Sequence, residues 1–254
     1  MKKIGTLLLC FVLIFTLSSC SSDSEFVFAD NKTIAIQSNY AGEKAVEQYD
    51  NGDFEIVTFT NASDIVSTLE NGINTYGILS EKEVQTYTNN QRNIRVVEQC
   101  DYKIEYGIYF SKENEGLKES FDLALTELEK DGTLSKIKNA YLSGDEYHIE
   151  TEEEFCGTLV MACDPNFKER VELDEDGNLF GMDVEIAKAV TSYLGYGLEF
   201  DIMDFDEMFI ELINNNVDFV LSAAEITEER TKSYLCTPYF TTRFYLVEGK
   251  FFND

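Results

Sequence analysis

Short apolar runs alternate with amphipathic stretches in the first third of the chain. Thr33 to Gln37, Glu55 to Phe59 and Tyr76 to Leu79 are rich in apolar and β-branched residues, a pattern typical of buried strands. A turn-prone and then helical stretch, Ser38 to Tyr49, follows the first run, and Ala62 to Asn71 has its apolar residues on one helical face. This order predicts a β-α-β-α-β unit with a mostly parallel sheet.

The second half of the chain repeats the same order with different residues. Strands are predicted at Thr158 to Ala162, Leu198 to Ile202 and Phe219 to Leu221, with helices at Met182 to Leu194 and Asp206 to Asn214. We therefore expect an α/β fold with two lobes, each a mostly parallel sheet flanked by helices. Such a duplication is typical of a two-lobed clamp.

A long helical stretch, Lys112 to Leu142, lies between the two repeats, with apolar residues on one face and an interruption at Asp131-Gly132. The acidic run Glu150 to Glu154 is predicted to be a solvated linker. These patterns place the first lobe at residues 30–106, and the family resemblance described below adds residues 246–254 to it. The second lobe takes residues 107–245, including the helical stretch 112–142.

The N-terminus has the pattern of an export signal. Met1-Lys2-Lys3 is basic, Ile4 to Leu17 is apolar but too short to span a bilayer comfortably, and small residues precede Cys20. Leu17-Ser18-Ser19-Cys20 resembles a bacterial lipobox, which implies a signal peptide at residues 1–19, lipidation of Cys20 and a polar tether at residues 20–29. The alternative is an ordinary signal peptide with an incidental cysteine.

The charge balance excludes nucleic acid as a partner. The formal net charge is −28 at pH 7, which would repel a phosphate backbone. His148 is the single histidine and the chain has no Cys-x-x-Cys pair, so neither a metal site nor any other cofactor is expected. The composition, 44% hydrophobic, supplies enough apolar material for a globular core.

Cysteine chemistry stays open at the level of sequence. Besides Cys10 and Cys20, the chain carries Cys100, Cys156, Cys163 and Cys236. In an extracytoplasmic compartment these residues can form one or two disulfides. Buried free thiols are the equal alternative, and no pairing follows from the sequence.

The predicted topology nominates binding residues directly. In open parallel sheets, ligands bind beyond the carboxyl ends of the strands. In the first lobe this rule selects Ser38 to Ala41, Thr58-Phe59 and Ser80-Glu81. In the second lobe it selects three further segments: Cys163 to Phe167, Met203 to Asp206 and Ser222 to Glu225.

Several spaced motifs in the second half carry a family resemblance. They are Gly177-Asn178-Leu179-Phe180-Gly181-Met182-Asp183-Val184-Glu185-Ile186-Ala187, Asp204-Phe205-Asp206, Ser222 to Arg230 (Ser-Ala-Ala-Glu-Ile-Thr-Glu-Glu-Arg) and Thr237-Pro238-Tyr239-Phe240. In this order they resemble family 3 bacterial solute-binding proteins. The resemblance implies a two-lobed periplasmic-binding-protein-like fold that closes by a hinge, with Tyr106 to Phe110 and Thr241 to Val247 as the strands that cross between lobes.

The first half resembles the same family, but in swapped order. Thr33 to Ser38, Tyr106-Gly107-Ile108 and Asp131 to Ile137 look like the part that normally follows Pro238-Tyr239-Phe240. We therefore expect a circular permutation, which two-lobed folds with neighbouring termini tolerate, with Asp30 close to Asn253. The rival interpretation is a fragment of a tandem array, half of one module followed by half of the next.

The resemblance also implies the site. Arg230 takes the place of the family arginine that holds a ligand α-carboxylate, a task that suits the planar guanidinium fork. The alternative for Arg230 is a surface ion pair with Glu229. The remaining expected ligand-binding residues lie at the same strand ends: Ser222, Ala223, Glu225, Phe205, Asp164, Phe167, Ser38, Tyr40, Ser80 and Glu81.

Some of these positions depart from the family pattern. Glu225 stands where a hydroxyl residue usually assists Arg230, and a carboxylate there would repel an acidic ligand. Ser80 stands where an aspartate commonly receives the ligand ammonium, with Glu81 adjacent. The acidic residues around the predicted cleft favour a cationic or amine-bearing solute. Phe167 and Phe205, with Tyr40 and Tyr239, are candidate aromatic walls.

The resemblance implies the lipid-anchored binding component of an ABC importer at the extracytoplasmic face of a bacterial cell membrane. Its partners would be a small polar solute, such as an amino acid or amine, and a permease with its ATPase. We expect a monomer and no catalysis. Two alternatives stay open: a dehydratase-like enzyme on the same fold, with Glu225 beside Arg230 as its candidate groups, and a non-transport sensor or binding module with a degenerate cleft.

Overall fold

The computed structural model describes residues 33–49, 52–150 and 155–250. The predicted signal peptide, the tether, Cys20 and the Asp30–Asn253 proximity therefore lie outside the described residues. In the first lobe the strands are β1 (Thr33–Gln37), β2 (Glu55–Phe59) and β3 (Tyr76–Ser80). The helices are α1 (Tyr40–Val46), a 3-10 turn (Glu47–Tyr49), α2 (Ala62–Glu70) and α3 (Glu81–Asn89). The predicted strands are confirmed, whereas α3 was not foreseen.

The second lobe is larger. Its shorter strands are β5 (Thr158–Cys163), β8 (Gly197–Ile202), β9 (Phe219–Val220) and the hairpin β6–β7 (Glu172–Leu173 and Leu179–Phe180). Its helices are α4 (Glu115–Lys130), α5 (Thr133–Ser143), α6 (Met182–Tyr193), α7 (Phe205–Ile213) and α8 (Glu228–Ser233). The helical stretch expected at residues 112–142 is two helices, and the break lies at the predicted interruption, Asp131-Gly132. Gly132, at φ +85°, ends α4 in a left-handed conformation.

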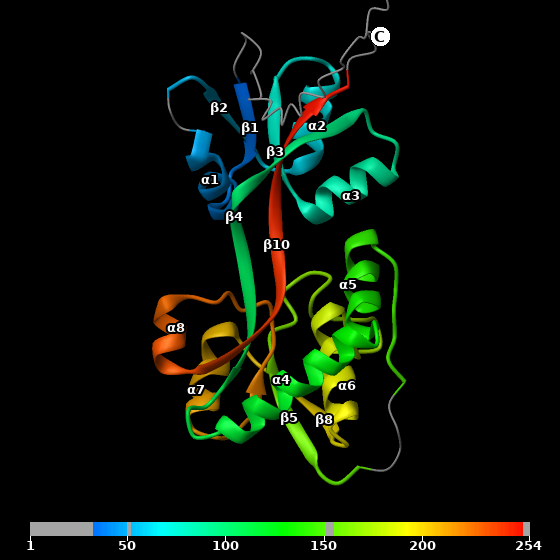
Figure 1. Ribbon diagram of the computed structural model, residues 1–254, viewed down its shortest axis with the longest axis vertical. Helices are drawn as coiled ribbons and strands as arrows, with labels where there is room; N and C mark the ends of the chain where they lie inside the picture. The colour runs from blue at the N-terminus through cyan, green and yellow to red at the C-terminus, as the bar shows by residue number, and fades with distance from the viewer. Residues whose placement is uncertain (1–32, 50–51, 151–154, 251–254) are drawn as a thin grey trace, which may run out of the picture. The chain divides into compact units, whose positions relative to one another are not determined.

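Two long strands, β4 (Ile94–Phe110) and β10 (Leu235–Gly249), run through both lobes. They pair with each other in antiparallel fashion from Leu235↔Phe110 to Gly249↔Ile94. The predicted crossing strands are therefore parts of much longer ones: Tyr106 to Phe110 is the C-terminal end of β4, and Thr241 to Val247 lies within β10. Instead of two separate sheets, one eight-stranded sheet has the order β2-β1-β3-β10-β4-β9-β5-β8 (Figure 1).

Strand directions match the expected fold class in each lobe. β1 is parallel to β2 and β3, and β5 is parallel to β8 and β9. The long strands are antiparallel to their neighbours β3 and β9. The fold is therefore α/β with mostly parallel lobes, joined through an antiparallel pair.

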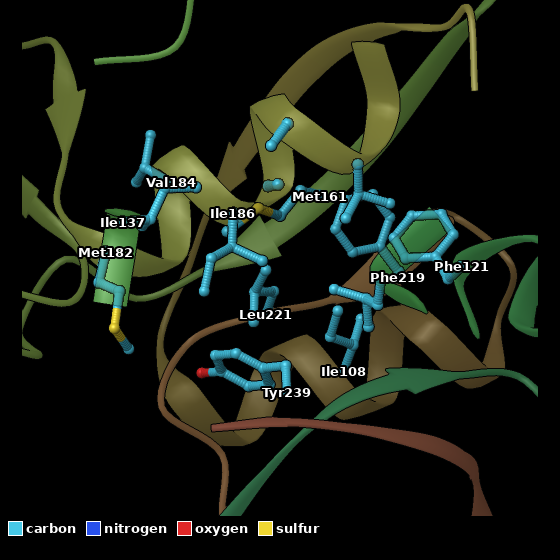
Figure 2. Close-up of a cluster of buried hydrophobic side chains, with 14 of the residues drawn as sticks. Ile108, Phe121, Ile137, Met161, Met182, Val184, Ile186, Phe219, Leu221 and Tyr239 are labelled. Carbon is cyan, nitrogen blue, oxygen red and sulfur yellow. The ribbon is translucent and has the colours of Figure 1, made fainter. Parts of the chain in front are cut away.

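The second lobe holds the largest core. Helices α4, α5 and α6 bury their apolar faces against β4, β5 and β9. Phe121 of α4 lies with its ring centroid 4.9 Å from Phe219 and 5.0 Å from Phe110. Figure 2 shows Phe121 beside Phe219, with Met161, Ile186 and Leu221 filling the space toward Tyr239. Such an aromatic cluster fixes α4 on the sheet by area burial and by edge-to-face ring contacts.

The four cysteines of the described residues are free. Cys100 and Cys163 are buried, and burial raises the pKa of the Cys100 thiol to about 11 and that of Cys163 to about 12. Cys236 is half-buried and Cys156 is exposed. Of the two alternatives, buried thiols therefore describe Cys100 and Cys163.

Candidate functional site

The carboxyl ends of the parallel strands in the two lobes face each other across the crossing strands. In the first lobe, Ser80 at the end of β3 pairs with Phe244 of β10. In the second lobe, the chain beyond β9 reaches Glu225, which bridges to Tyr106, the partner of Phe240. Four residues of β10, about 14 Å at strand spacing, separate the two levels. The strand-end rule therefore brings the predicted residues to one junction (Figure 1).

The loop after β9 is locked to the loop after β5. The Ser222 hydroxyl accepts a hydrogen bond from the Asp164 N–H (3.0 Å) and donates one to the Asp164 carbonyl (3.1 Å). Both residues are buried. Ala223 follows with a left-handed φ of +48°, and its N–H donates to the Asp183 carboxylate (2.7 Å). Ser222 and Asp164 thus hold the shape of the second-lobe edge, and their polar atoms are already occupied.

Arg230 lies in α8, beside two aromatic rings. The Thr227 hydroxyl caps α8 by accepting from the Arg230 N–H (3.2 Å). The guanidinium carbon is 5.1 Å from the Phe205 ring centroid and 5.2 Å from that of Phe209. The Phe167 ring is in turn 5.4 Å from Phe205. The structure therefore brings three of the predicted site residues together: Arg230, Phe205 and Phe167.

The guanidinium of Arg230 has free capacity for an anion. It donates a hydrogen bond to the Glu225 carbonyl oxygen at 2.8 Å and also contacts the Tyr109 hydroxyl. Among the described residues it forms no ion pair with a carboxylate, and Glu229 in particular is not its partner. A guanidinium carries five N–H donors, so a bidentate acceptor can still bind.

Glu225 contributes its main chain to the arrangement. Its carbonyl accepts from Arg230 and also from the Tyr109 hydroxyl, at 2.5 Å. The neighbouring backbone pairs with β4, where Ile226 N–H donates to the Glu105 carbonyl at 2.7 Å. Arg230 is therefore anchored through the Glu225 backbone, and no ion pair joins the two side chains in the described part of the chain.

In the first lobe the predicted residues are mainly structural. Ser80 caps α3 in a capping box: its hydroxyl donates to the Glu83 carboxylate (2.8 Å) and accepts from the Glu83 N–H (3.4 Å). The Glu81 carboxylate lies 3.4 Å from the Arg243 guanidinium. Ser38 is exposed and Tyr40 begins α1. Ser80 and Glu81 line a cavity of about 270 Å³ between α3 and α5, together with Lys82, Tyr141 and Phe240.

The sequence analysis missed the most buried charged pair of the described residues, Arg170 with Asp183. Arg170 Nε donates to the Asp183 carboxylate at 2.8 Å, and the side chains are 6% and 0% exposed. Tyr239 donates its hydroxyl to the second Asp183 oxygen at 2.7 Å and accepts a hydrogen bond from Arg170. Arg170 stands in a charged, surface-like run, Lys168 to Glu172, so its burial had no sequence signature.

Aromatic rings surround the Arg170 guanidinium. The guanidinium carbon is 4.4 Å from the Tyr106 centroid, 5.1 Å from Phe240 and 5.5 Å from Tyr239. Burial raises the pKa of Tyr239 well above its usual value; the Arg170 charge opposes this rise and the Asp183 carboxylate adds to it. Tyr239 therefore stays protonated and remains a donor to Asp183. This cluster holds β4, β10 and α6 together beneath the candidate site.

The described residues contain no group of three or more histidine, cysteine, aspartate or glutamate side chains placed to hold a metal ion. No helix in the same residues combines the length and apolar character needed to cross a membrane. The chemistry available at the junction is therefore that of Arg230, the two phenylalanine rings and nearby carboxylates.

We predict that Asp183→Ala lowers the free energy of unfolding by about 3–5 kcal/mol, because it leaves the Arg170 guanidinium buried without a counter-charge. Urea unfolding followed by circular dichroism measures the difference. The control is Glu228→Ala, which removes an exposed partner of Lys232 and should change stability by no more than about 0.5 kcal/mol. A loss below about 1 kcal/mol for Asp183→Ala would contradict the prediction.

Comparison with known proteins finds similarity for one segment of the second lobe. Residues 159–250 match the family model of the bacterial extracellular solute-binding proteins, family 3. The arginine-binding extracellular protein ArtP of Bacillus subtilis (strain 168) is 36% identical over 93 residues, covering 36% of each chain. The L-cystine-binding protein TcyJ of the same strain is 30% identical over 93 residues, 35% of each chain.

Among solved structures, an ancestral arginine-binding protein bound to arginine is 39% identical, covering 30% of this chain and 34% of that one, with a TM-score of 0.30. The chain thus spans about a third of the length of the relatives it matches. The matched segment contains the Arg230 turn, Phe205 and the Pro238-Tyr239-Phe240 strand in the order that the motifs predicted. Residues 159–250 of this chain are thus similar to the bacterial extracellular solute-binding proteins, family 3.

Proposed function

We propose that the chain is the extracytoplasmic solute-binding component of an ABC importer, and that it captures an amino acid or a related small polar or cationic solute between its two lobes. The placement of Arg230 carries the proposal. Its guanidinium lies beside the Glu225 carbonyl and the Phe205 and Phe209 rings of the second lobe, and it forms no ion pair with a carboxylate of the described residues. This is the arrangement that a ligand carboxylate needs.

The surroundings of Arg230 support a zwitterionic or cationic ligand. A carboxylate on Arg230 would place the remainder of the solute beside Phe205 and Phe167, whose rings attract cations. Asp164 and Glu225 add negative charge nearby. The relatives are described as binding arginine, histidine or L-cystine, so these three compounds are the first candidates.

The membrane partners follow from the family and from the N-terminal pattern. Similarity to family 3 supports an extracytoplasmic location and a permease with its ATPase as partners. We propose that a lipid on Cys20 attaches the chain to the outer face of the cytoplasmic membrane, as the Leu17-Ser18-Ser19-Cys20 sequence indicates. The expected monomer also belongs to this proposal.

We further propose that the chain is a circular permutant of its family. Ile34 near the start of β1 and Glu248 near the end of β10 both pair with Tyr76 of β3. Two strand spacings, about 10 Å, therefore separate the two ends of the described chain. The continuous pairing of β4 with β10 unites both halves in one sheet, which favours permutation over a tandem-array fragment.

Ligand capture is testable on the chain from Ser21 onward, which retains the compact unit of residues 31–254. We expect L-arginine, L-histidine or L-cystine to raise the melting temperature, because a ligand of the folded state stabilises it by mass action. Arg230→Ala should weaken binding about 100-fold through loss of a charged bidentate contact. Arg95→Ala, an exposed arginine paired with Glu248, is the matched control and should bind normally. No shift with any of the three compounds, or binding unaffected by Arg230→Ala, would refute the proposal.

Lipid attachment predicts that Cys20→Ser abolishes incorporation of a labelled fatty acid in bacteria that express the full chain. The substituted protein should leave the membrane fraction, since the acyl chains supply the attachment. Cys156→Ser, which alters an exposed cysteine of the second lobe, should keep both properties. Unchanged labelling of Cys20→Ser would rule out this anchor.

Permutation predicts that a reordered chain folds. The reordered chain begins at Phe155, joins Lys250 to Thr33 through a linker of about eight residues and ends at Gly144. It should unfold in one cooperative transition with a native circular dichroism spectrum. The reason is that the linker has to bridge only about 10 Å between the two ends of the described chain. A chain of the same composition with the linker placed inside α6 is the control and should fail to fold. Failure of both chains would argue against neighbouring ends.

A further inference from the structure

The two lobes are joined by little backbone. In the described residues, β4 and β10 alone cross between them. The segment of β10 that crosses between the lobes, Phe240 to Arg243, pairs with β4. The pairing register shifts at both ends of this segment, between Pro238 and Phe240 and between Arg243 and Tyr245. A two-stranded ribbon twists more readily than a wide sheet, and such irregularities bend it further. The arrangement of the lobes therefore depends on side-chain contacts across the junction.

One such contact is made by Lys82 of α3, in the first lobe. Its ammonium forms an ion pair with Glu169 of the second lobe and lies 4.1 Å from the ring centroid of Tyr141 in α5. The Lys82 side chain is only 18% exposed. The Lys82 ammonium thus contacts a carboxylate and the face of an aromatic ring at once. Because the lysine side chain is partly shielded from water, both attractions are stronger than at an open surface.

Contacts within the second lobe fix the backbone of Glu169, the residue that pairs with Lys82. Glu169 has a φ of +62°, which is uncommon for a residue with a side chain. Its N–H donates to the Glu172 carboxylate, and its carbonyl accepts from the Met182 N–H at 3.1 Å. Gly181 permits this close approach, because a Cβ there would lie 2.5 Å from the Arg170 carbonyl oxygen. The Glu169 backbone is therefore held in place at the start of α6, while its side chain is 53% exposed.

Lys82 is surrounded by carboxylates from both lobes, so its positive charge determines whether the lobes attract or repel each other there. The cavity of about 270 Å³ between α3 and α5 is lined by the carboxylates Glu81, Glu83 and Glu169, and Lys82 is its only basic residue. Arg243 lies near Glu81. Lys82 is nevertheless the one cation in this lining between Glu83 of α3 and Glu169 of the second lobe, so without its ammonium these two carboxylates would repel each other. Lys82 thus converts a repulsive contact between α3 and the second lobe into an attractive one.

We propose that Lys82, Tyr141 and Glu169 form an inter-lobe latch that holds α3 against α5 whether or not a solute is bound. Opening the junction on this side requires that Lys82 separates from Glu169 and Tyr141. The latch also adjoins the candidate site, because Glu169 precedes Arg170, whose partner Asp183 accepts the Ala223 N–H. The lobes therefore have a built-in bias toward closure that does not depend on ligand capture.

The latch is tested by small-angle X-ray scattering of the chain from Ser21 onward, with no solute added. Lys82→Met and Glu169→Gln should each increase the radius of gyration. The ratio of closed to open molecules should fall about fivefold, as expected for loss of one ion pair and one cation–π contact. The double variant should resemble the single ones, because both act on one interaction. Lys82→Arg should retain the closed form.

The matched control is Lys188→Met. Lys188 pairs with Glu185 within the second lobe, and its side chain is 25% exposed, so its loss should leave the scattering unchanged. A carbodiimide, which couples an amine to a carboxylate in contact, should produce a Lys82–Glu169 amide detectable by peptide mass spectrometry. Scattering of Lys82→Met and Glu169→Gln identical to that of the unsubstituted chain, with cooperative melting, would overturn the latch. So would absence of that amide in the unsubstituted chain.

Discussion

The buried ion pair between Arg170 and Asp183 is the interaction on which the candidate site depends. Burying two charges is costly, and the cost is offset only when every polar atom finds a partner. Here Asp183 accepts from Arg170, Tyr239 and the Ala223 N–H, while aromatic rings of β4 and β10 enclose the guanidinium. One cluster therefore connects the crossing strands, the start of α6 and the loop that leads to Arg230, and so fixes the second-lobe edge as a unit.

This unit contrasts with the sparse link to the first lobe. The second lobe holds the Arg230 side chain in a fixed position and is joined to the first lobe through a two-stranded ribbon. This arrangement suits a protein that closes on a solute. The arginine site uses backbone contacts, since Ser222, Ala223 and Glu225 are fixed by main-chain hydrogen bonds. Among the described contacts, Arg230 is held by the Glu225 carbonyl and by the Phe205 and Phe209 rings.

The acidic composition also affects how the two lobes contact each other. A net charge of −28 makes repulsion between the lobes the default where their surfaces approach. Cations at the junction are few, so each has a large effect: Lys82 joins α3 to the second lobe, and Arg243 lies near Glu81. Arg230, in turn, forms no ion pair with a carboxylate of the described residues and donates to the Glu225 carbonyl.

The sequence by itself determined the strands β1, β2, β3, β5 and β8, the α/β class and the strand-end position of Phe205 and Phe167, because apolar periodicity and parallel topology are local properties. Arg230 followed from the family resemblance of the Ser222 to Arg230 motif and not from the strand-end rule. It did not reveal α3, whose polar residues give no apolar face to read, or the long strands, whose crossing segment has no regular alternation. Only the tertiary structure decided that Ser80 is a helix cap and that Arg170 is buried. Both outcomes depend on partners distant in the chain, such as Tyr239 for Arg170, and contacts at that separation leave no periodic pattern in the sequence.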